Sequence, residues 1–147
     1  MGNYILKTKI DLETASTLLT KVLDAVNESV QRYQRNNDVF SKTMYEKAFK
    51  RYSVYRECKD NLDFVIEVLK DYLDNHPEES SFGYTPRKIT SISDIGKYQQ
   101  ETLNAKRYLQ SKLLFMASVR GNEDEIKLYQ ECIKKLDYVY SHIAKNQ

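Results

Sequence analysis

The carboxylates between Asp60 and Asp74 are spaced in a way that could hold a metal ion. Five acidic side chains recur there at intervals of three and four residues, so they share one face of a helix. One Glu-x-x-Asp pair is present at Glu57, but the companion Glu-x-x-Glu of a two-motif magnesium site is absent. The acidic face also points away from Leu62 and Ile66, so the pattern favours a solvated face over a metal site.

Other catalytic arrangements are also missing. Neither His76 nor His142 follows a Glu by three residues, as the di-iron site of a helical bundle requires. Two histidines and two inward-facing cysteines, Cys58 and Cys132, do not provide zinc-ligand spacing. No glycine-rich phosphate loop or Gly-x-Ser-x-Gly elbow occurs. We therefore expect no catalytic, metal-binding or cofactor-binding residue and a protein that is not an enzyme, although a site assembled from distant helices stays an alternative.

The stretch that carries the carboxylates has an uneven charge distribution. From Lys42 to Lys59 six cations stand against two anions, a net charge of +4, whereas from Asp60 to Glu79 seven carboxylates stand against one lysine, a net charge of −6. The helix dipole favours the opposite arrangement, with anions near the N-terminus and cations near the C-terminus. This polarity therefore suggests a role other than helix stability.

Aromatic residues are interleaved with the cations of the basic half. Tyr45, Phe49, Tyr52 and Arg56 form a stripe beside the core face of the helix. Aromatic rings and arginine are enriched at protein interfaces, which predicts docking to an acidic or aromatic protein partner. The alternative is that another helix, or residues 1–10, covers these rings.

Two further interpretations use the same part of the chain or the loop that follows it. Nucleic acid could meet Lys42, Lys50 and Arg56 through phosphates, but the net charge of only +2 and the adjacent acidic half weaken this alternative. Within residues 77–92, exposed aromatics beside a cation could anchor a protein partner. The residues concerned are Phe82, Tyr84 and Arg87.

A homodimer is a further alternative. Leu103 and Leu114 lie off the main apolar face of the third predicted helix, and Leu128 and Val139 lie off that of the fourth. Each pair is separated by eleven residues, or three helical turns. The two lines suit either an outward dimer seam or wider burial inside the monomer.

The elements that must position these residues are helices. Apolar residues recur at three- and four-residue spacing, glycine and proline are sparse, and the spacing predicts helices over residues 11–35, 38–75, 94–120 and 123–145. Asp38 or Ser41 could cap the second helix, Gly121 ends the third, and Asn122 with Glu125 resembles a capping box. We expect an arm or short strand over residues 1–10 and a long loop over residues 77–92, which contain both prolines.

The fold class that follows is all-α. A chain of 147 residues is about one domain long, and four amphipathic helices in one domain predict a four-helix bundle over residues 1–147. We place Met116 and Val119 inward on the third helix and Tyr140 inward on the fourth. An up-down-up-down order would put the first and third turns at one pole of the bundle. That pole would bring together Arg32, Arg35, Lys42 and Arg120.

The environment and function class follow from what is missing. No cationic segment followed by an apolar core opens the chain, and no apolar run approaches 18 residues, so we expect a cytoplasmic protein without a signal peptide or membrane partner. The leading hypothesis is a non-enzymatic interaction module, such as a small bacterial or phage regulator, inhibitor or adaptor. A nucleic-acid-binding protein and a structural homo-oligomer are the alternatives.

Overall fold

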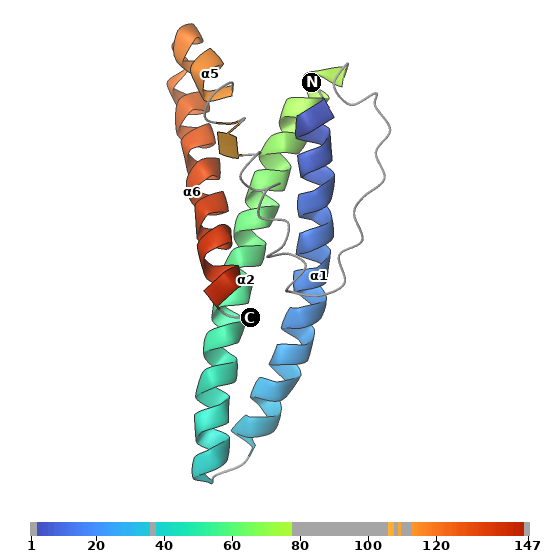
Figure 1. The fold of residues 1–147 in the computed structure, drawn as a ribbon, viewed down its shortest axis with the longest axis vertical. Coiled ribbons are helices and arrows are strands. Elements are labelled where there is room, and N and C mark those ends of the chain that lie inside the picture. Colours follow the sequence, from blue (N-terminus) through green and yellow to red (C-terminus); the bar gives the residue numbers. More distant parts are fainter. Residues whose placement is uncertain (1–2, 36–37, 78–105, 108, 110–112, 146–147) are drawn as a thin grey trace.

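The described residues of the computed structural model are 3–35, 38–77, 106–107, 109 and 113–145. They form four α-helices, with no strand in these ranges. The predicted all-α, four-helix fold is therefore confirmed. The helices, drawn in Figure 1, are α1 (Asn3–Gln34), α2 (Val39–Asp74), α5 (Leu114–Arg120) and α6 (Glu123–Lys145).

The N-terminal residues are helical. The arm or short strand predicted over residues 1–10 is wrong for residues 3–10, which form the first turns of α1. Ile5 and Thr8 are each 1% exposed and continue the three- and four-residue spacing of Leu12 and Ala15. Helices in proteins are stabilised mainly by packing of their apolar face, so burial of Ile5 extends the helix where local periodicity was weak.

Both ends of α2 have a clear local cause. Asp38 accepts hydrogen bonds from the backbone N–H of Ser41 at 2.7 Å and from its hydroxyl at 3.1 Å, and these bonds lower the pKa of Asp38. At the other end the N–H of Asn75 donates to the carbonyl of Asp71. Pro77 follows and disfavours further helix.

The turn between α5 and α6 is closed by its own backbone. Gly121 has a φ of 69°, a left-handed conformation that glycine adopts without strain, and its N–H donates to Ser118. The N–H of Asn122 donates to Ala117, and the side chain of Asn122 accepts from the N–H of Glu125 at 3.1 Å. The short turn makes α5 and α6 an antiparallel pair (Figure 1).

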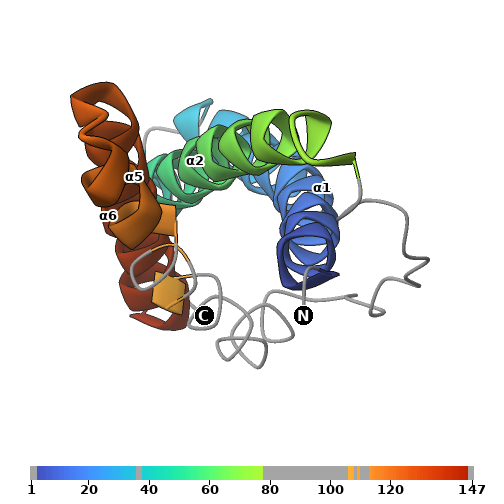
Figure 2. The same ribbon diagram turned by 90° about the horizontal axis from the view of Figure 1, so that it is seen from above.

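Helix α2 is the central element of the described structure. It contacts α1 and α6, and α5 contacts α6. Viewed from above, α1 and α6 lie on different sides of α2 (Figure 2). A hydrogen bond from Ser16 to Asp63 joins α1 to α2. On the other side, Lys135 of α6 lies 4.8 Å from the centre of the Phe64 ring of α2.

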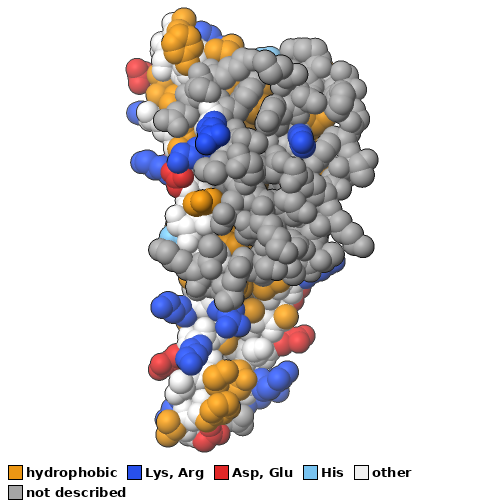
Figure 3. All heavy atoms as spheres, viewed as in Figure 1, with side chains coloured by type: hydrophobic (Ala, Val, Ile, Leu, Met, Phe, Trp, Pro, Cys, Tyr) orange, Lys and Arg blue, Asp and Glu red, His pale blue; other side chains and the backbone are white. Residues whose placement is uncertain are grey.

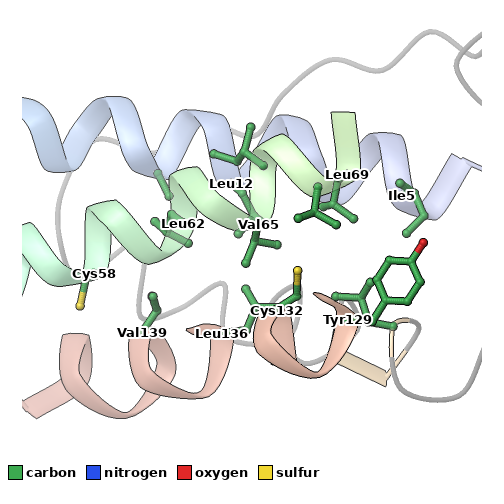
Figure 4. Packing of buried hydrophobic residues seen from close by; sticks show 14 of the residues in the cluster. Ile5, Leu12, Cys58, Leu62, Val65, Leu69, Tyr129, Cys132, Leu136 and Val139 are labelled. Atoms are coloured by element: carbon green, nitrogen blue, oxygen red, sulfur yellow. The ribbon is translucent and has the colours of Figure 1, made fainter. Parts of the chain in front are cut away.

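The buried seam between α2 and α6 alternates in steps of three and four residues on both helices. Such spacing places the side chains of two nearly antiparallel helices in interdigitating layers. Figure 4 shows Cys58 of α2 opposite Val139 of α6 and Leu12 of α1 on the other side of α2. The seam consists of Tyr55, Cys58, Leu62, Val65 and Leu69 on α2 and Tyr129, Cys132, Leu136, Val139 and Ile143 on α6.

The inward face of α6 is rotated relative to the prediction. Val139, for which the sequence left both an outward dimer seam and burial inside the monomer open, is 3% exposed, whereas Tyr140, predicted inside, is 39% exposed. Tyr129, Leu136 and Ile143 belong to both the predicted and the observed inward face of α6. Residue spacing alone therefore did not decide which side chains fill the layers between them. Cys132, which the sequence placed inward, and Val139 fill these layers.

The third helix is also rotated. Leu109, Leu113 and Ala117 are buried at steps of four, while Met116 and Val119, predicted inward, are 40% and 71% exposed. The step from Leu113 to Ala117 follows one line of the α-helix α5, and Met116 and Val119 lie off this line.

The order of the helices differs from up-down-up-down. Helix α6 is antiparallel to α2, since Tyr138 bonds Glu57 while the N-terminal turns of α6 lie beside the C-terminal end of α2. Figure 1 shows the α5–α6 turn at the end opposite the α1–α2 turn. The predicted pole containing Arg120 together with Arg32 and Lys42 is therefore wrong, because Arg120 lies with Asp71 and His76.

The rotated seam predicts different responses to one substitution at two valines. Val139→Ser should lower the free energy of unfolding by about 2 to 4 kcal/mol, because it removes buried apolar area and buries a hydroxyl. Val119→Ser should change it by no more than about 0.5 kcal/mol, since valine and serine have similar helix propensities and Val119 is exposed. Urea unfolding followed by circular dichroism measures both, and equal losses would contradict the assigned seam.

Candidate interaction surfaces

The α1–α2 turn projects beyond the rest of the described structure. Figure 1 shows that α6 ends part-way along α2, and the last turns of α1 and the first turns of α2 continue past it as a pair. In α1 no described residue beyond Leu23 is buried, and in the first turns of α2 the buried residues are the small Ser41 and Ala48. We call residues 24–35 and 38–54 the projecting hairpin.

The predicted aromatic stripe starts on this hairpin, and its residues differ in how far they are exposed to solvent. Phe49 is 52% exposed, whereas Tyr45 and Tyr52 are half-buried. The rings of Tyr45 and Phe49 stack with their centres 6.0 Å apart, and Tyr52 packs against the edge of the core. Phe49 therefore keeps about half of its surface accessible beside the half-buried Tyr45. The stripe is thus partly packing and partly surface.

Arg56 ends the stripe as an exposed cation. Its guanidinium lies 3.5 Å from a carboxylate oxygen of Asp60, and both side chains are about 60% exposed, at 58% and 60%. Ion pairs with such exposure contribute roughly 0 to 1 kcal/mol to stability. Arg56 can therefore exchange Asp60 for a carboxylate of a partner at little cost to the fold.

The lysines around Phe49 are available for intermolecular contacts. Lys42, Lys47 and Lys50 are exposed, and within the described part of the chain they form no ion pair. Lys42 and Arg56 lie seven residues before and after Phe49, so the three side chains follow one line along α2. Figure 3 shows hydrophobic and cationic side chains together on the projecting hairpin.

The acidic half of α2 behaves as the predicted solvated face at most of its positions. Asp60, Glu67, Asp71 and Asp74 are exposed. Asp63 is the exception, because its carboxylate accepts from Ser16 and from Lys59, the latter at 2.6 Å. In the described part of the chain, no group of three or more His, Cys, Asp or Glu side chains is placed to hold a metal ion.

The remaining predicted site residues fall into different environments. Phe82, Tyr84, Arg87 and Leu103 lie outside the described residues. Of the predicted dimer seam, Leu114 packs against the core and Leu128 is 38% exposed. With Val139 buried inside the monomer, an outward line through Leu128 and Val139 is wrong.

A cleft at the end opposite the projecting hairpin was not predicted. It has a volume of about 380 Å³ and lies between the C-terminal turns of α2, helix α5 and the N-terminal turns of α6. Leu113, Met116 and Leu128 supply apolar walls, and Tyr72 and Tyr129 supply rings. No short-range motif could have indicated it, because its residues come from three separate segments. Besides the two tyrosines, its charged and polar side chains are Asp71, Asn75, His76, Arg120 and Glu125.

Both histidines have the same local geometry. Each ring stacks on the tyrosine four residues earlier, with centres 4.2 Å apart for Tyr72 and His76 and 3.8 Å for Tyr138 and His142. Each Nδ1 lies 2.8 Å from the carbonyl oxygen of that tyrosine. A carbonyl only accepts, so Nδ1 carries the proton. These contacts anchor the histidines near the ends of α2 and α6 and explain them structurally.

Tyr138 also joins α6 to α2. Its hydroxyl donates to a carboxylate oxygen of Glu57 at 2.7 Å. Burial and this bond to an anion both raise the pKa of Tyr138, because they disfavour the phenolate. On α2 this bond lies three residues beyond residue 54, where the projecting hairpin ends.

The two cysteines are buried in the seam as free thiols. Burial raises the pKa of Cys58 to about 12 and that of Cys132 to about 12, with smaller contributions from Glu57 and Glu131 respectively. Reactive cysteines need an accessible thiolate, so this environment indicates packing residues.

Comparison of the chain with protein-family models, with curated proteins and with solved structures found no match. Within the described ranges, no helix has an apolar segment long enough to cross a bilayer. The functional argument therefore depends on the surfaces described above.

The buried thiols predict a loss of stability in alkali. Their pKa rises from 9.0 in an ordinary environment to about 12 in the folded protein, so above about pH 9 the unfolded chain loses protons that the folded chain keeps. The free energy of unfolding should fall by roughly 1.4 kcal/mol per pH unit for each thiol once pH exceeds its unfolded pKa, and should not change through these groups at lower pH.

Urea unfolding under reducing conditions at a series of pH values measures this slope. The control is the Cys58→Ala, Cys132→Ala variant, which should be less stable at neutral pH but should show a shallower decline between about pH 9 and pH 10. Identical slopes in the two proteins would show that the thiols ionise within the folded state.

Proposed function

We propose that this protein is a non-enzymatic interaction module that binds an acidic protein partner through the projecting hairpin. The observation that carries the proposal is the exposed face of Phe49 between Lys42 and Arg56 on a part of the molecule that extends beyond α6. Such a module would serve as a small regulator, inhibitor or adaptor.

The shape of the hairpin supports docking into a partner. Two packed helices present a narrow, convex surface, which suits insertion into a groove. Stacking against Tyr45 fixes the ring of Phe49 before binding, so little side-chain entropy is lost when a partner covers it. Phe49 therefore has the properties of a central apolar anchor.

The charges support an acidic partner. Lys42, Lys47 and Lys50 need no rearrangement to meet carboxylates, and Arg56 needs only to leave an exposed pair with Asp60. Charges at the rim of an interface mainly increase the rate of association and select partners of opposite sign. The apolar anchor would then determine how long the complex lasts.

Nucleic acid is the second candidate, because the same three lysines could neutralise phosphates. The affinity of the chain for nucleic acid would fall steeply as the salt concentration rises, because each phosphate contact releases condensed counterions. Protein binding through an apolar anchor should depend on salt mainly through the association rate. Titrations of the chain with DNA and RNA oligonucleotides at low and physiological salt separate these candidates.

The proposal predicts that Phe49→Ala with Arg56→Ala strongly weakens binding to the partner and preserves the fold. Proteins captured from a cell extract by the immobilised wild-type chain would be purified and tested individually. Loss of a central aromatic anchor should weaken binding on the order of 30-fold, corresponding to about 2 kcal/mol. Stability should change by no more than about 1 kcal/mol, because Phe49 is half-exposed and the Arg56 pair is on the surface.

Tyr140→Ala with Lys134→Ala is the matched control, since it also removes one exposed aromatic and one exposed cation but lies on α6. This control should bind like the wild type. Equal binding by the Phe49 variant and the wild type would exclude the hairpin face as the docking surface. Collapse of the fold in that variant would show that the stripe is core.

A further inference from the structure

The two ends of the molecule carry apolar surfaces of complementary shape. At the tip of the projecting hairpin Val39 is 81% exposed and Phe40 is 68% exposed, in the first turn of α2. At the other end the 380 Å³ cleft has apolar walls that include Met116 and Leu128, which are 40% and 38% exposed. One end thus presents protruding apolar side chains and the other presents a hollow.

The cleft has the size and chemistry of a site for an aromatic ring. Its volume is within the range of sites that enclose small ligands, roughly 300 to 1,000 Å³. Tyr72 and Tyr129 line it together with the apolar side chains, and a ring packed edge-to-face or offset against another ring is favoured. A phenylalanine side chain entering the cleft would find both aromatic and aliphatic contacts.

The charges around the two surfaces are also complementary. Within residues 32–42, Arg32, Arg35 and Lys42 stand against Asp38, a net charge of +2. Within the described residues 70–76 and 120–127, which line or flank the cleft, five carboxylates stand against three cations, a net charge of −2. The carboxylates are those of Asp71, Asp74, Glu123, Asp124 and Glu125, and the cations are those of Lys70, Arg120 and Lys127.

We propose that the chain associates head to tail with copies of itself, with Phe40 of one copy inserted into the cleft between α2, α5 and α6 of the next. The attraction between the basic tip and the acidic rim would orient the two copies, and burial of Phe40 and Val39 would hold them. This interaction goes beyond the proposed function, because it uses the tip and the cleft and leaves the face of Phe49 free.

The geometry determines the kind of assembly. Tip and cleft are different surfaces at opposite ends of the molecule (Figure 1), so the contact is heterologous and each added copy leaves a free tip and a free cleft. Such an assembly does not close at two copies. Its average mass therefore rises with protein concentration without a plateau at the dimer.

Sedimentation equilibrium tests the proposal with one variant at each end. Phe40→Glu places an acid in the first turn of α2, where the helix dipole favours it, so the fold should be kept while the tip is repelled by the acidic rim. Leu128→Glu places a carboxylate at the cleft mouth, where entry of the Phe40 ring would bury that charge without a partner. Each variant alone should have the mass of a single chain at concentrations where the wild type associates.

An equimolar mixture of the two variants provides the decisive measurement. The intact tip of the Leu128→Glu chain can still enter the intact cleft of the Phe40→Glu chain, whereas contact between their other two surfaces would bring two introduced carboxylates together. The mixture should therefore give a species of twice the chain mass and nothing larger, and added salt should weaken it. The Phe49→Ala, Arg56→Ala variant should associate like the wild type, which separates this interaction from the proposed docking function.

Several outcomes would overturn the proposal. A wild-type chain that keeps the mass of one copy at every accessible concentration would exclude self-association. A plateau at the dimer mass would indicate a closed, symmetric interface. Association that persists in either single variant, or a mixture that stays monomeric although both variants are folded by circular dichroism, would exclude the contact between Phe40 and the cleft.

Discussion

The structure depends on a mismatch in length between α2 and the helix that packs on its second side. Helix α2 has 36 residues and α6 has 23, which at 1.5 Å per residue corresponds to about 54 Å and about 35 Å. Helix α6 packs along α2 from about Tyr55 to the C-terminal turns of α2, so the first turns of α2 keep α1 as their neighbour among the described helices. Where a helix packs against a neighbouring helix on only one side, part of its apolar stripe stays exposed to solvent. This is why Tyr45 and Tyr52 are half-buried while Phe49 between them is exposed.

The same mismatch separates the chemistry of the two ends. Where α6 lies on α2, free thiols and aliphatic side chains fill the layers, and the acidic face of α2 points to solvent or is satisfied by Ser16 and Lys59. Where α6 is absent, the helix pair is joined through small buried residues and half-buried rings, and its lysines find no carboxylate among the described residues. The uneven charge of α2 therefore corresponds to a structural boundary at about Tyr55. The residues of α2 before Tyr55 belong to the projecting hairpin, and the residues from Tyr55 onward belong to the part of α2 that packs against α6 and ends at the cleft.

Periodicity predicted the helices well and their orientation less well. The cap at Asp38, the turn at Gly121 and the extent of α6 follow from local hydrogen-bonding rules, which act over a few residues and can be seen in the sequence. Which face of α6 turns inward was undecided locally, because Tyr129, Leu136 and Ile143 fit two adjacent faces. The burial of Cys132 agrees with the sequence, whereas the burial of Val139 in place of Tyr140 came from close packing against α2, an interaction between segments far apart in the sequence. The extra helical turns before Asp11 have the same origin, since burial of Ile5 decided them.

The sequence by itself determined the helical class, the helix ends that are set by capping, the exposed acidic face and the basic, aromatic character of the first half of α2. These properties depend on side-chain type and on neighbours within one or two turns. Only the tertiary structure decided that α6 runs antiparallel to α2 with its N-terminal end beside Asp71, that Phe49 stays accessible while Tyr52 is partly covered, and that a cleft forms at the far end. Each of these depends on where one helix stops relative to another, a distance that local residue spacing does not encode.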